Sequence, residues 1–188
     1  MSQIKYRASD NTWKNPKAIR TWDGSQWKQR VGYRWTGSKW EPIIQYDVYV
    51  IKDGNLSNNY TVYEYNSSSD SHHGPFNDTY TVESPTGGYI YLRTNQNVDL
   101  TKYSTFYVDF ALNYGGTGGD YTFMIASPQP SSSITSYARI DGYSSEGVQR
   151  RTKSVSVSSL SGNFSVYFGC SSFSDGSIGL AIYNMWFE

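Results

Sequence analysis

The chain has 188 residues, with 16 basic and 16 acidic side chains, one cysteine and no net charge at pH 7. Tyrosine (18) and tryptophan (6) raise the aromatic content to 17%, while alanine, leucine and glutamate number only 6, 6 and 5. A chain so poor in strong helix formers is not a mainly helical protein. The single cysteine excludes an internal disulfide framework. No apolar run approaches a membrane span, and the charges of Met1–Arg7 precede no apolar stretch, so we expect neither a membrane partner nor a secretory signal.

Charge and tryptophan content divide the chain into two parts. Residues 1–45 hold 9 basic and 3 acidic side chains, for a net charge of +6, whereas residues 46–188 hold 7 and 13, for a net charge of −6. Five of the six tryptophans precede residue 41. We therefore expect a boundary at about residues 43–46. The charge split fits either docking on an acidic partner or the ordinary surface of a small module, and both readings stay open.

The N-terminal part contains a repeat in which two tryptophans flank a Gly-Ser pair. Trp22–Trp27 reads W-D-G-S-Q-W, and Trp35–Trp40 reads W-T-G-S-K-W after a shift of 13 residues. A tight turn at Gly-Ser places the two tryptophans of each repeat opposite each other on paired strands. The repeat therefore predicts two successive β-hairpins in residues 19–45, preceded by an extended arm over residues 1–18.

The four hairpin tryptophans are the candidate assembly residues of the chain: Trp22, Trp27, Trp35 and Trp40. Isolated hairpins are marginally stable in water, so a module of this size does not bury four indoles by itself. We favour packing on other subunits or on the second domain over ligand stacking, because cross-strand pairing already explains the spacing. We therefore expect a homo-oligomer. A trimer would suit a projecting fibre, but the sequence does not indicate the symmetry of the oligomer.

Residues 46–188 show the pattern of a β-sandwich. Short β-rich runs are separated by turn clusters, and Phe106, Val108, Phe110 and Leu112 alternate with residues of the opposite face. One-sided burial in many short strands is typical of antiparallel sheets stacked on a common core. The predicted fold class is therefore all-β, an antiparallel β-sandwich with the jelly roll as first choice. The ten predicted strands are Tyr46–Ile51, Tyr60–Tyr65, Thr79–Glu83, Tyr89–Thr94, Thr105–Asn113, Tyr121–Ser127, Ser136–Asp141, Thr152–Val157, Asn163–Gly169 and Ser177–Phe187.

Two segments of the C-terminal part carry recognisable motifs. Val98–Val108 reads V-D-L-T-K-Y-S-T-F-Y-V, and Ser156–Phe164 reads S-V-S-S-L-S-G-N-F. They resemble the D-L-T-x-Y-S-x-hydrophobic and D-V-S-S-L-S-G-x-Y segments in the C-terminal domains of tail and minor structural proteins of phages and prophages of Gram-positive hosts. Ile182–Phe187 resembles their closing strand, and the tryptophan repeats resemble tandem hairpins of phage virion proteins. The likeness covers about half of the chain. The family pattern has Asp where Ser156 stands here, so no acidic role carries over to that position.

The resemblance implies a carbohydrate-binding-module-like jelly roll carried on a virion attachment segment. The expected location is the virion, assembled in the host cytoplasm, and the expected partners are other phage virion proteins and a glycan of the host cell wall. The choice between head and tail stays open. The alternatives are a head fibre or capsid-decorating protein without a ligand and a small polysaccharide-degrading enzyme. Nucleic acid is a weaker option that rests on the basic N-terminal part with its interleaved tryptophans.

Catalytic residues are sparse in this sequence. The only histidines, His72 and His73, are adjacent in a segment that we interpret as a solvated loop, which does not position a base for a catalytic triad. Cys170 follows an apolar β-run and is expected to be a buried, inert thiol. The carboxylates are scattered. We therefore expect no enzyme, no cofactor and no catalytic metal, while a structural Ca²⁺ stays open.

A glycine-rich loop gives the candidate carbohydrate site. Gly115–Gly119 is flanked by Tyr114, Asp120 and Tyr121, and Tyr143 is a further candidate in a later turn. An aromatic ring stacks on the apolar face of a sugar, and a nearby acid accepts hydrogen bonds from its hydroxyls. The alternative is that these tyrosines are half-buried packing residues, because tyrosines occur throughout the chain.

Overall fold

The computed structural model describes residues 48–113, 118–130, 134–173 and 176–188 in full, together with the backbone of six short strands before residue 48. The chain divides into two compact units, Met1–Asp47 and Val48–Glu188. Each unit is described by itself.

The first unit contains two hairpins with the register that the tryptophan repeat predicts. Strand β3 (Ile19–Trp22) pairs with β4 (Trp27–Arg30), which places Trp22 opposite Trp27. Strand β5 (Tyr33–Trp35) pairs with β6 (Trp40–Pro42), which places Trp35 opposite Trp40. The four indole side chains lie outside the described residues, so their role in assembly stays a prediction.

The expected extended arm over residues 1–18 differs from the structure. Strand β1 (Tyr6–Arg7) pairs antiparallel with β2 (Trp13–Lys14), and Arg7 lies opposite Trp13. The sequence between the two strands carries Ser, Asp and Asn, which favour turns. The Trp-Lys pair of β2 also repeats the Trp27-Lys28 pair that begins β4. This third pairing has no Gly-Ser turn, which is why the repeat pattern does not reveal it.

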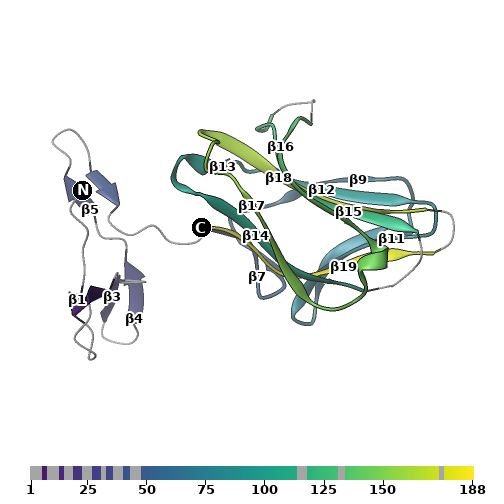
Figure 1. Ribbon diagram of the computed structural model, residues 1–188, viewed down its shortest axis with the longest axis horizontal. Coiled ribbons are helices and arrows are strands. Elements are labelled where there is room, and N and C mark those ends of the chain that lie inside the picture. The colour runs from purple at the N-terminus through teal and green to yellow at the C-terminus, as the bar shows by residue number, and fades with distance from the viewer. Residues whose placement is uncertain are drawn as a thin grey trace. The chain divides into compact units, whose positions relative to one another are not determined.

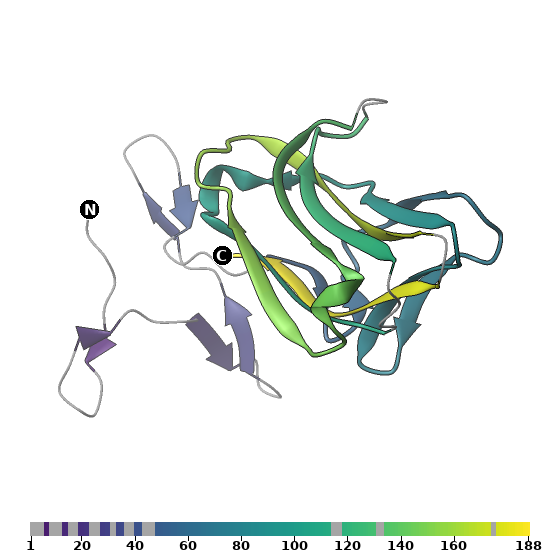
Figure 2. The same cartoon turned by 45° about the vertical axis from the view of Figure 1, so that its right-hand side comes forward.

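The second unit is a sandwich of two antiparallel sheets (Figure 1, Figure 2). This arrangement confirms the predicted all-β fold. The first sheet has the order β10-β11-β19-β14-β17, with β7 paired to β19 and β8 paired to β7. Its strands are β7 (Val48–Lys52), β8 (Asn55–Leu56), β10 (His72–Phe76), β11 (Thr79–Ser84), β14 (Thr105–Leu112), β17 (Arg151–Ser156) and β19 (Ile178–Phe187).

The second sheet has the order β16-β15-β18-β12-β9, with β13 paired to β18. Its strands are β9 (Val62–Asn66), β12 (Tyr89–Thr94), β13 (Val98–Asp99), β15 (Gly119–Ala126), β16 (Ser136–Tyr143) and β18 (Asn163–Ser172). Two short 3₁₀ turns, η1 (Leu100–Lys102) and η2 (Ser144–Glu146), complete the unit. Within the described ranges the chain forms no helix with the length and apolarity that a membrane crossing needs.

All ten predicted strands are present, with ends that differ by at most three residues. Three short or edge strands were not predicted: β8, β10 and β13. Strand β10 reads H-H-G-P-F, which lacks apolar alternation and contains a proline. Proline is tolerated on an edge strand, and β10 is the edge of the first sheet. The interpretation of the two histidines as loop residues is therefore wrong.

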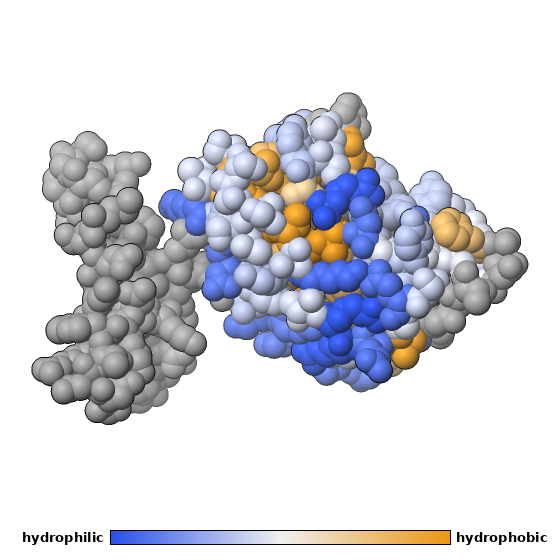
Figure 3. All heavy atoms as spheres, in the orientation of Figure 1, coloured by the Kyte–Doolittle hydropathy of each residue, from blue (hydrophilic) through white to orange (hydrophobic). Residues whose placement is uncertain are grey.

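The core lies between the inner faces of the two sheets. Phe106, Val108, Phe110 and Leu112 of β14 are buried, as their alternation predicts. Phe110 packs edge-on against Tyr121 with ring centroids 5.0 Å apart, and tilted against Phe123 at 5.1 Å. Each fully buried apolar side chain of this size contributes roughly 1.5–3 kcal/mol. On the face shown in Figure 3, apolar side chains gather in the middle of this unit and hydrophilic residues flank them.

Candidate functional site

Tyrosines cover the outer face of the second sheet. Because side chains alternate along a strand, Tyr63 and Tyr65 of β9 share one face, and so do Tyr89 and Tyr91 of β12. Ile90 and Leu92, which alternate with the β12 tyrosines, belong to the buried core. Strand β18 adds one more tyrosine. We call the set the tyrosine face: Tyr63, Tyr65, Tyr89, Tyr91 and Tyr167.

Three rings of the tyrosine face, those of Tyr89, Tyr91 and Tyr167, stack in a row. Tyr91 lies against Tyr167 with ring centroids 5.2 Å apart and planes inclined by 18°, and against Tyr89 at 6.0 Å and 27°. Tyr91 is paired with Gly169 of β18. A Cβ atom at Gly169 would lie 2.7 Å from both Cα and ring Cδ1 of Tyr91. Glycine at position 169 therefore allows this close approach of Tyr91.

Burial affects the ionisation of two phenols of this face, those of Tyr91 and Tyr167. It raises the pKa of Tyr91 above the usual value of 10.0, although a hydrogen bond with Ser171 acts in the opposite direction. Burial also raises the pKa of Tyr167, and the neighbouring tyrosines add to the effect. Both hydroxyls therefore stay protonated well above neutral pH and can donate hydrogen bonds to a ligand.

A small polar hollow of about 200 Å³ opens beside Tyr91. Strands β15 and β16 supply its polar lining, which consists of Asp120, Thr122, Arg139, Asp141 and Tyr143. We call these five residues and the space between them the polar hollow. Asp141 Oδ1 accepts hydrogen bonds from Thr122 Oγ1 at 2.5 Å and from Arg139 Nη2 at 2.8 Å. Asp120 accepts one from the Ser171 hydroxyl. The hollow thus presents carboxylates, a guanidinium and a phenol.

The sheet register explains why the hollow adjoins the tyrosines. Tyr91 pairs with Gly169, Gly169 with Thr122, and Thr122 with Asp141, so one row of residues crosses four strands. A second row runs from Tyr89 through Ser171 and Asp120 to Tyr143 in the same way. Each row starts on a tyrosine and ends on a residue of the polar hollow.

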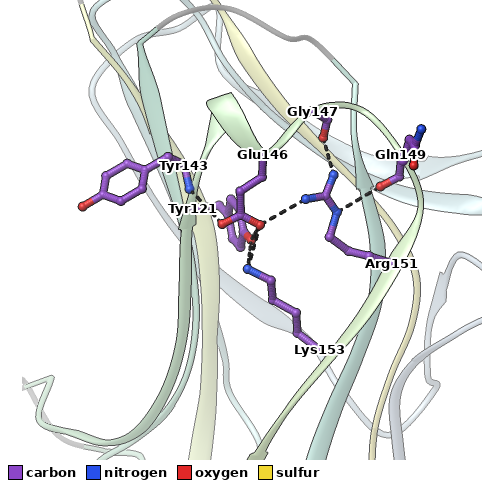
Figure 4. Close-up of polar contacts among 7 residues, drawn as sticks. All are labelled: Tyr121, Tyr143, Glu146, Gly147, Gln149, Arg151 and Lys153. Atoms are coloured by element: carbon purple, nitrogen blue, oxygen red, sulfur yellow. Dashed lines mark hydrogen bonds and ion pairs between the residues drawn. The ribbon is translucent and has the colours of Figure 1, made fainter.

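A charged network, whose charged side chains are partly exposed, contacts the end of β16 (Figure 4). Glu146 of η2 accepts hydrogen bonds at Oε2 from Lys153 Nζ (2.7 Å), the Tyr121 hydroxyl (2.9 Å) and Arg151 Nη1 (3.0 Å). Its Oε1 accepts the backbone N–H of Tyr143 at 3.4 Å. We call Glu146, Lys153, Tyr121 and Arg151 the Glu146 network. The Tyr143 ring points away from it (Figure 4).

The Glu146 network packs directly beneath the strand that carries the hollow. A Cβ atom at Gly142 would overlap Glu146 Oε1 and the Tyr121 hydroxyl, so the network touches the backbone between Asp141 and Tyr143. Burial alone would raise the pKa of Glu146, but hydrogen bonds from Lys153 and Tyr121 hold it below its usual value. Burial would likewise lower the pKa of Lys153, and the bonds to Glu146 and Tyr121 raise it instead. Both groups therefore stay charged near neutral pH.

The candidate residues from the sequence have different locations. Asp120 and Tyr143 line the polar hollow, and Tyr143 is 63% exposed. Tyr121 is only 1% exposed, and its ring packs in the core against Phe110 and Phe123. Its ring is therefore not a stacking surface, and it contributes through the Glu146 network. Tyr114 lies outside the described residues.

The sequence interpretation missed the whole tyrosine face, since none of its candidate residues belongs to it. The alternation of tyrosine with core residues in Tyr89–Leu92 is the signal that indicates an outward-facing row. It also missed Arg139, Asp141 and Thr122. Their alternation with core residues also indicates that they face outward. The sequence does not indicate that β15 and β16 belong to the same sheet as β12, with β18 between β15 and β12.

The other reactive side chains lie elsewhere. His72 Nε2 lies 2.7 Å from Glu83 Oε2, whereas His73 Nδ1 lies 2.7 Å from the Tyr80 hydroxyl, so the neighbouring histidines have different partners. Cys170 is fully buried, and burial raises the pKa of its thiol, which makes it a poor nucleophile. Among the described residues, no three His, Cys, Asp or Glu side chains come together as a metal site.

Comparisons with known proteins support the fold. No protein-family model matches the chain, and no curated protein matches it. Solved structures of family 29 carbohydrate binding modules are similar to it. A mutant complexed with mannohexaose has a TM-score of 0.51 and 11% identity, covering 75% of this chain and 89% of that module. A mutant complexed with cellulohexaose has a TM-score of 0.50, 11% identity and the same coverage. A further mutant has a TM-score of 0.50 and 10% identity, covering 77% of this chain and 92% of the module. At these identities the likeness shows a shared sandwich fold.

Proposed function

We propose that the second unit is a carbohydrate-binding module whose ligand site is the tyrosine face together with the polar hollow. The observation that carries the proposal is the position of Tyr91, which is stacked on Tyr167 and also lines the hollow that holds Asp120, Arg139 and Asp141. The fold shared with family 29 carbohydrate binding modules adds support at the level of architecture.

The chemistry of this surface suits a sugar. A pyranose has an apolar face of C–H groups, which packs on an aromatic ring, and a rim of hydroxyls, which both donate and accept hydrogen bonds. The tyrosine face offers rings, while Asp120 and Asp141 accept and Arg139 donates. Stacked, partly buried rings and paired charges have little freedom to lose on binding, which favours affinity.

The dimensions favour a polysaccharide chain over a single sugar. The row through Tyr91 continues to Tyr65 of β9, so it crosses all five strands from β9 to β16. Neighbouring strands are about 4.8 Å apart, so the face spans roughly 19 Å across the sheet. We infer that several linked sugar units lie across the strands, with stacking on the tyrosine side and hydroxyl contacts on the β16 side.

We propose binding without turnover. A glycosidase needs one carboxyl group that stays protonated to act as the general acid. Glu146, the acid held beside the polar hollow, has a lowered pKa and is committed to Lys153 and Arg151, so it is poorly suited to that role. Glu146 is therefore not the general acid that a polysaccharide-degrading enzyme would need.

For the whole chain we propose a phage virion component whose first unit attaches to the particle. The resemblance of Val98–Val108 and Ser156–Phe164 to phage structural proteins supports this role, and so do the tandem hairpins with opposed tryptophans. The wall glycan of a Gram-positive host is then the expected ligand. A capsid-decorating protein without a ligand is the alternative.

Affinity electrophoresis of the full chain tests the proposal. The gels contain glucomannan, soluble cellulose derivatives or purified wall polysaccharide from Gram-positive bacteria, and a reducing-sugar assay is run on the same mixtures. We expect retarded migration in at least one gel and no sugar release. Unretarded migration in every gel would favour the decorating role, and released sugar would identify an enzyme.

A further inference from the structure

The outer face of the first sheet, on the other side of the sandwich, carries a larger groove of about 690 Å³. Its floor consists of small side chains on three adjacent strands, since Gly74 pairs with Thr81 and Thr81 with Ala181. The intervening residues Tyr80 and Val82 face the core. The groove is therefore deep here because the outward side chains are small, and bulkier residues lie on both sides of it.

One wall of the groove is polar. Glu83 lies at its centre, with Oε2 2.7 Å from His72 Nε2 and Oε1 accepting a hydrogen bond from Asn113 Nδ2 at 3.2 Å. A carboxylate has about four acceptor positions, so Glu83 can accept further bonds from a ligand. The His72 side chain is 64% exposed. The wall therefore presents an imidazole, a carboxylate and an amide side by side.

The opposite wall is aromatic. Phe76, at the end of β10, is 65% exposed, which is unusual for so large an apolar side chain. Tyr183 of β19 also lines the groove, and the Arg150 guanidinium carbon lies 3.7 Å from its ring centroid. Arg150 is itself held by Asp109, with Nη2 and Nε at 2.6 and 3.0 Å from the two carboxylate oxygens. One face of the Tyr183 ring therefore packs against a paired cation.

We propose that this groove is a second saccharide-binding site, which takes one or two sugar units. Its volume lies within the range of about 300–1,000 Å³ that small-ligand sites occupy. The low floor leaves room for a flat ring between an aromatic wall and a wall of hydroxyl partners. The described residues that line the groove include no lysine or arginine, which argues against an anionic ligand. The hydroxyls of an uncharged sugar both donate and accept, so they can form hydrogen bonds with Glu83, His72 and Asn113.

A second site on the opposite sheet changes what the module does. The groove and the tyrosine face share no residue and belong to different sheets. One molecule then binds two stretches of polysaccharide at the same time and cross-links them. Binding at two sites also raises the retention of the molecule on a polymer above the affinity of either site.

Isothermal titration of the full chain with mannohexaose, cellulohexaose and fragments of Gram-positive wall polysaccharide tests this inference. We expect two sites per chain for at least one of these probes. Phe76→Ala removes one ring of the aromatic wall, and Ala181→Leu fills the floor. Each variant should either retain a single site or bind sugar in the groove about tenfold more weakly. Phe173→Ala is the matched control, because Phe173 is also an exposed phenylalanine (51%) but does not line the groove.

Variants of the groove and of the tyrosine face distinguish the two sites in this titration. Tyr91→Ala combined with Tyr167→Ala should leave only the groove site, and the thermal unfolding midpoint verifies that each variant is folded. A single site in the wild-type chain, unaffected by Phe76→Ala and Ala181→Leu, overturns the groove proposal and leaves the tyrosine face intact. If the groove variants lose all binding and the tyrosine variants bind as the wild type does, the groove is supported as a site and the proposed function of the tyrosine face is overturned. Absence of binding to every probe overturns both.

Discussion

The rings of Tyr91 and Tyr167 lie 5.2 Å apart and nearly parallel on the outer face of the second sheet. The two residues belong to adjacent antiparallel strands, β12 and β18. Stacking restricts the rotation of both side chains before any ligand arrives, so little conformational entropy remains to be lost on binding. The pair therefore forms a rigid platform beside the polar hollow.

Tyr91→Ala should weaken polysaccharide binding by tenfold or more. The change removes a stacking surface, and aromatic contacts contribute about 0.5–1.5 kcal/mol beyond the area that they bury. Isothermal titration of the full chain with the best-retained polysaccharide measures the loss. Tyr137→Ala is the control, because Tyr137 is also exposed on this sheet but packs on Phe164 and does not line the polar hollow. Equal effects of the two changes would contradict the account.

Asp141→Ala should weaken binding by about tenfold with little effect on stability. Asp141 forms its ion pair with Arg139 at 2.8 Å, and both side chains are about half exposed, so the pair contributes at most about 1 kcal/mol to folding. A lost hydrogen bond to a ligand hydroxyl accounts for the weaker binding. Titration and urea unfolding, carried out on the same preparation, measure the two effects.

Asp99→Ala is the control for this prediction, because it should show the reverse pattern. The Asp99 carboxylate caps η1 by accepting the backbone N–H of Thr101 at 3.0 Å and its hydroxyl at 2.6 Å. Its loss should cost about 1 kcal/mol of stability and leave the ligand affinity unchanged. If Asp141→Ala proved as destabilising as Asp99→Ala, with no loss of affinity, Asp141 would be a structural residue.

Glu146→Gln should lower stability at pH 7 by about 1–2 kcal/mol, because it removes a carboxylate bound by Lys153 and Arg151. The pKa of Glu146 is lowered by folding, so its stabilisation is complete above the usual value of 4.5 and is lost as the pH falls through the folded-state pKa. The difference between wild type and variant should therefore shrink below pH 4.5. Urea unfolding at pH 7 and at pH 3 measures it. Glu188→Gln, at the exposed C-terminal residue, should show no comparable difference, and a gap that persists at pH 3 would contradict the linkage.

Trp27→Ala combined with Trp40→Ala should reduce self-association of the full chain. These residues lie opposite Trp22 and Trp35 in the two hairpins, and a module of this size offers little interior for four indoles. Light scattering measures the mass of wild type and variant at matched concentrations. A wild-type chain that is monomeric at all concentrations would remove the basis for an assembly role.

The sequence was sufficient for the sandwich but not for the site. Strands such as β14 were predictable because Phe106, Val108 and Phe110 alternate with polar positions, and this period follows directly from strand geometry. Strand β10 was not, because its glycine and proline are tolerated only at an edge, which the sequence does not identify. Tyr121 was assigned outward because it follows a glycine-rich loop, whereas its register on β15 turns it into the core.

The polar hollow could not be predicted without knowing the order of the strands in the sheet. Gly169, Thr122 and Asp141 lie on three strands, and their alignment in one row with Tyr91 depends on β18 lying between β12 and β15. Alternation gives the face of each residue but not the order of strands in a sheet. The Glu146 network was equally hidden, since η2 links the edge strands of two different sheets.

Chemical-shift mapping of the full chain by NMR tests the central claim most directly. Mannohexaose, cellulohexaose and fragments of Gram-positive wall polysaccharide are titrated in turn into ¹⁵N-labelled protein. The account predicts that the amides with the largest shifts include Tyr91, Thr122, Asp141 and Gly169, from four adjacent strands of the second sheet. Saturable binding that leaves these amides unshifted, or the absence of any shift with all three probes, would contradict it.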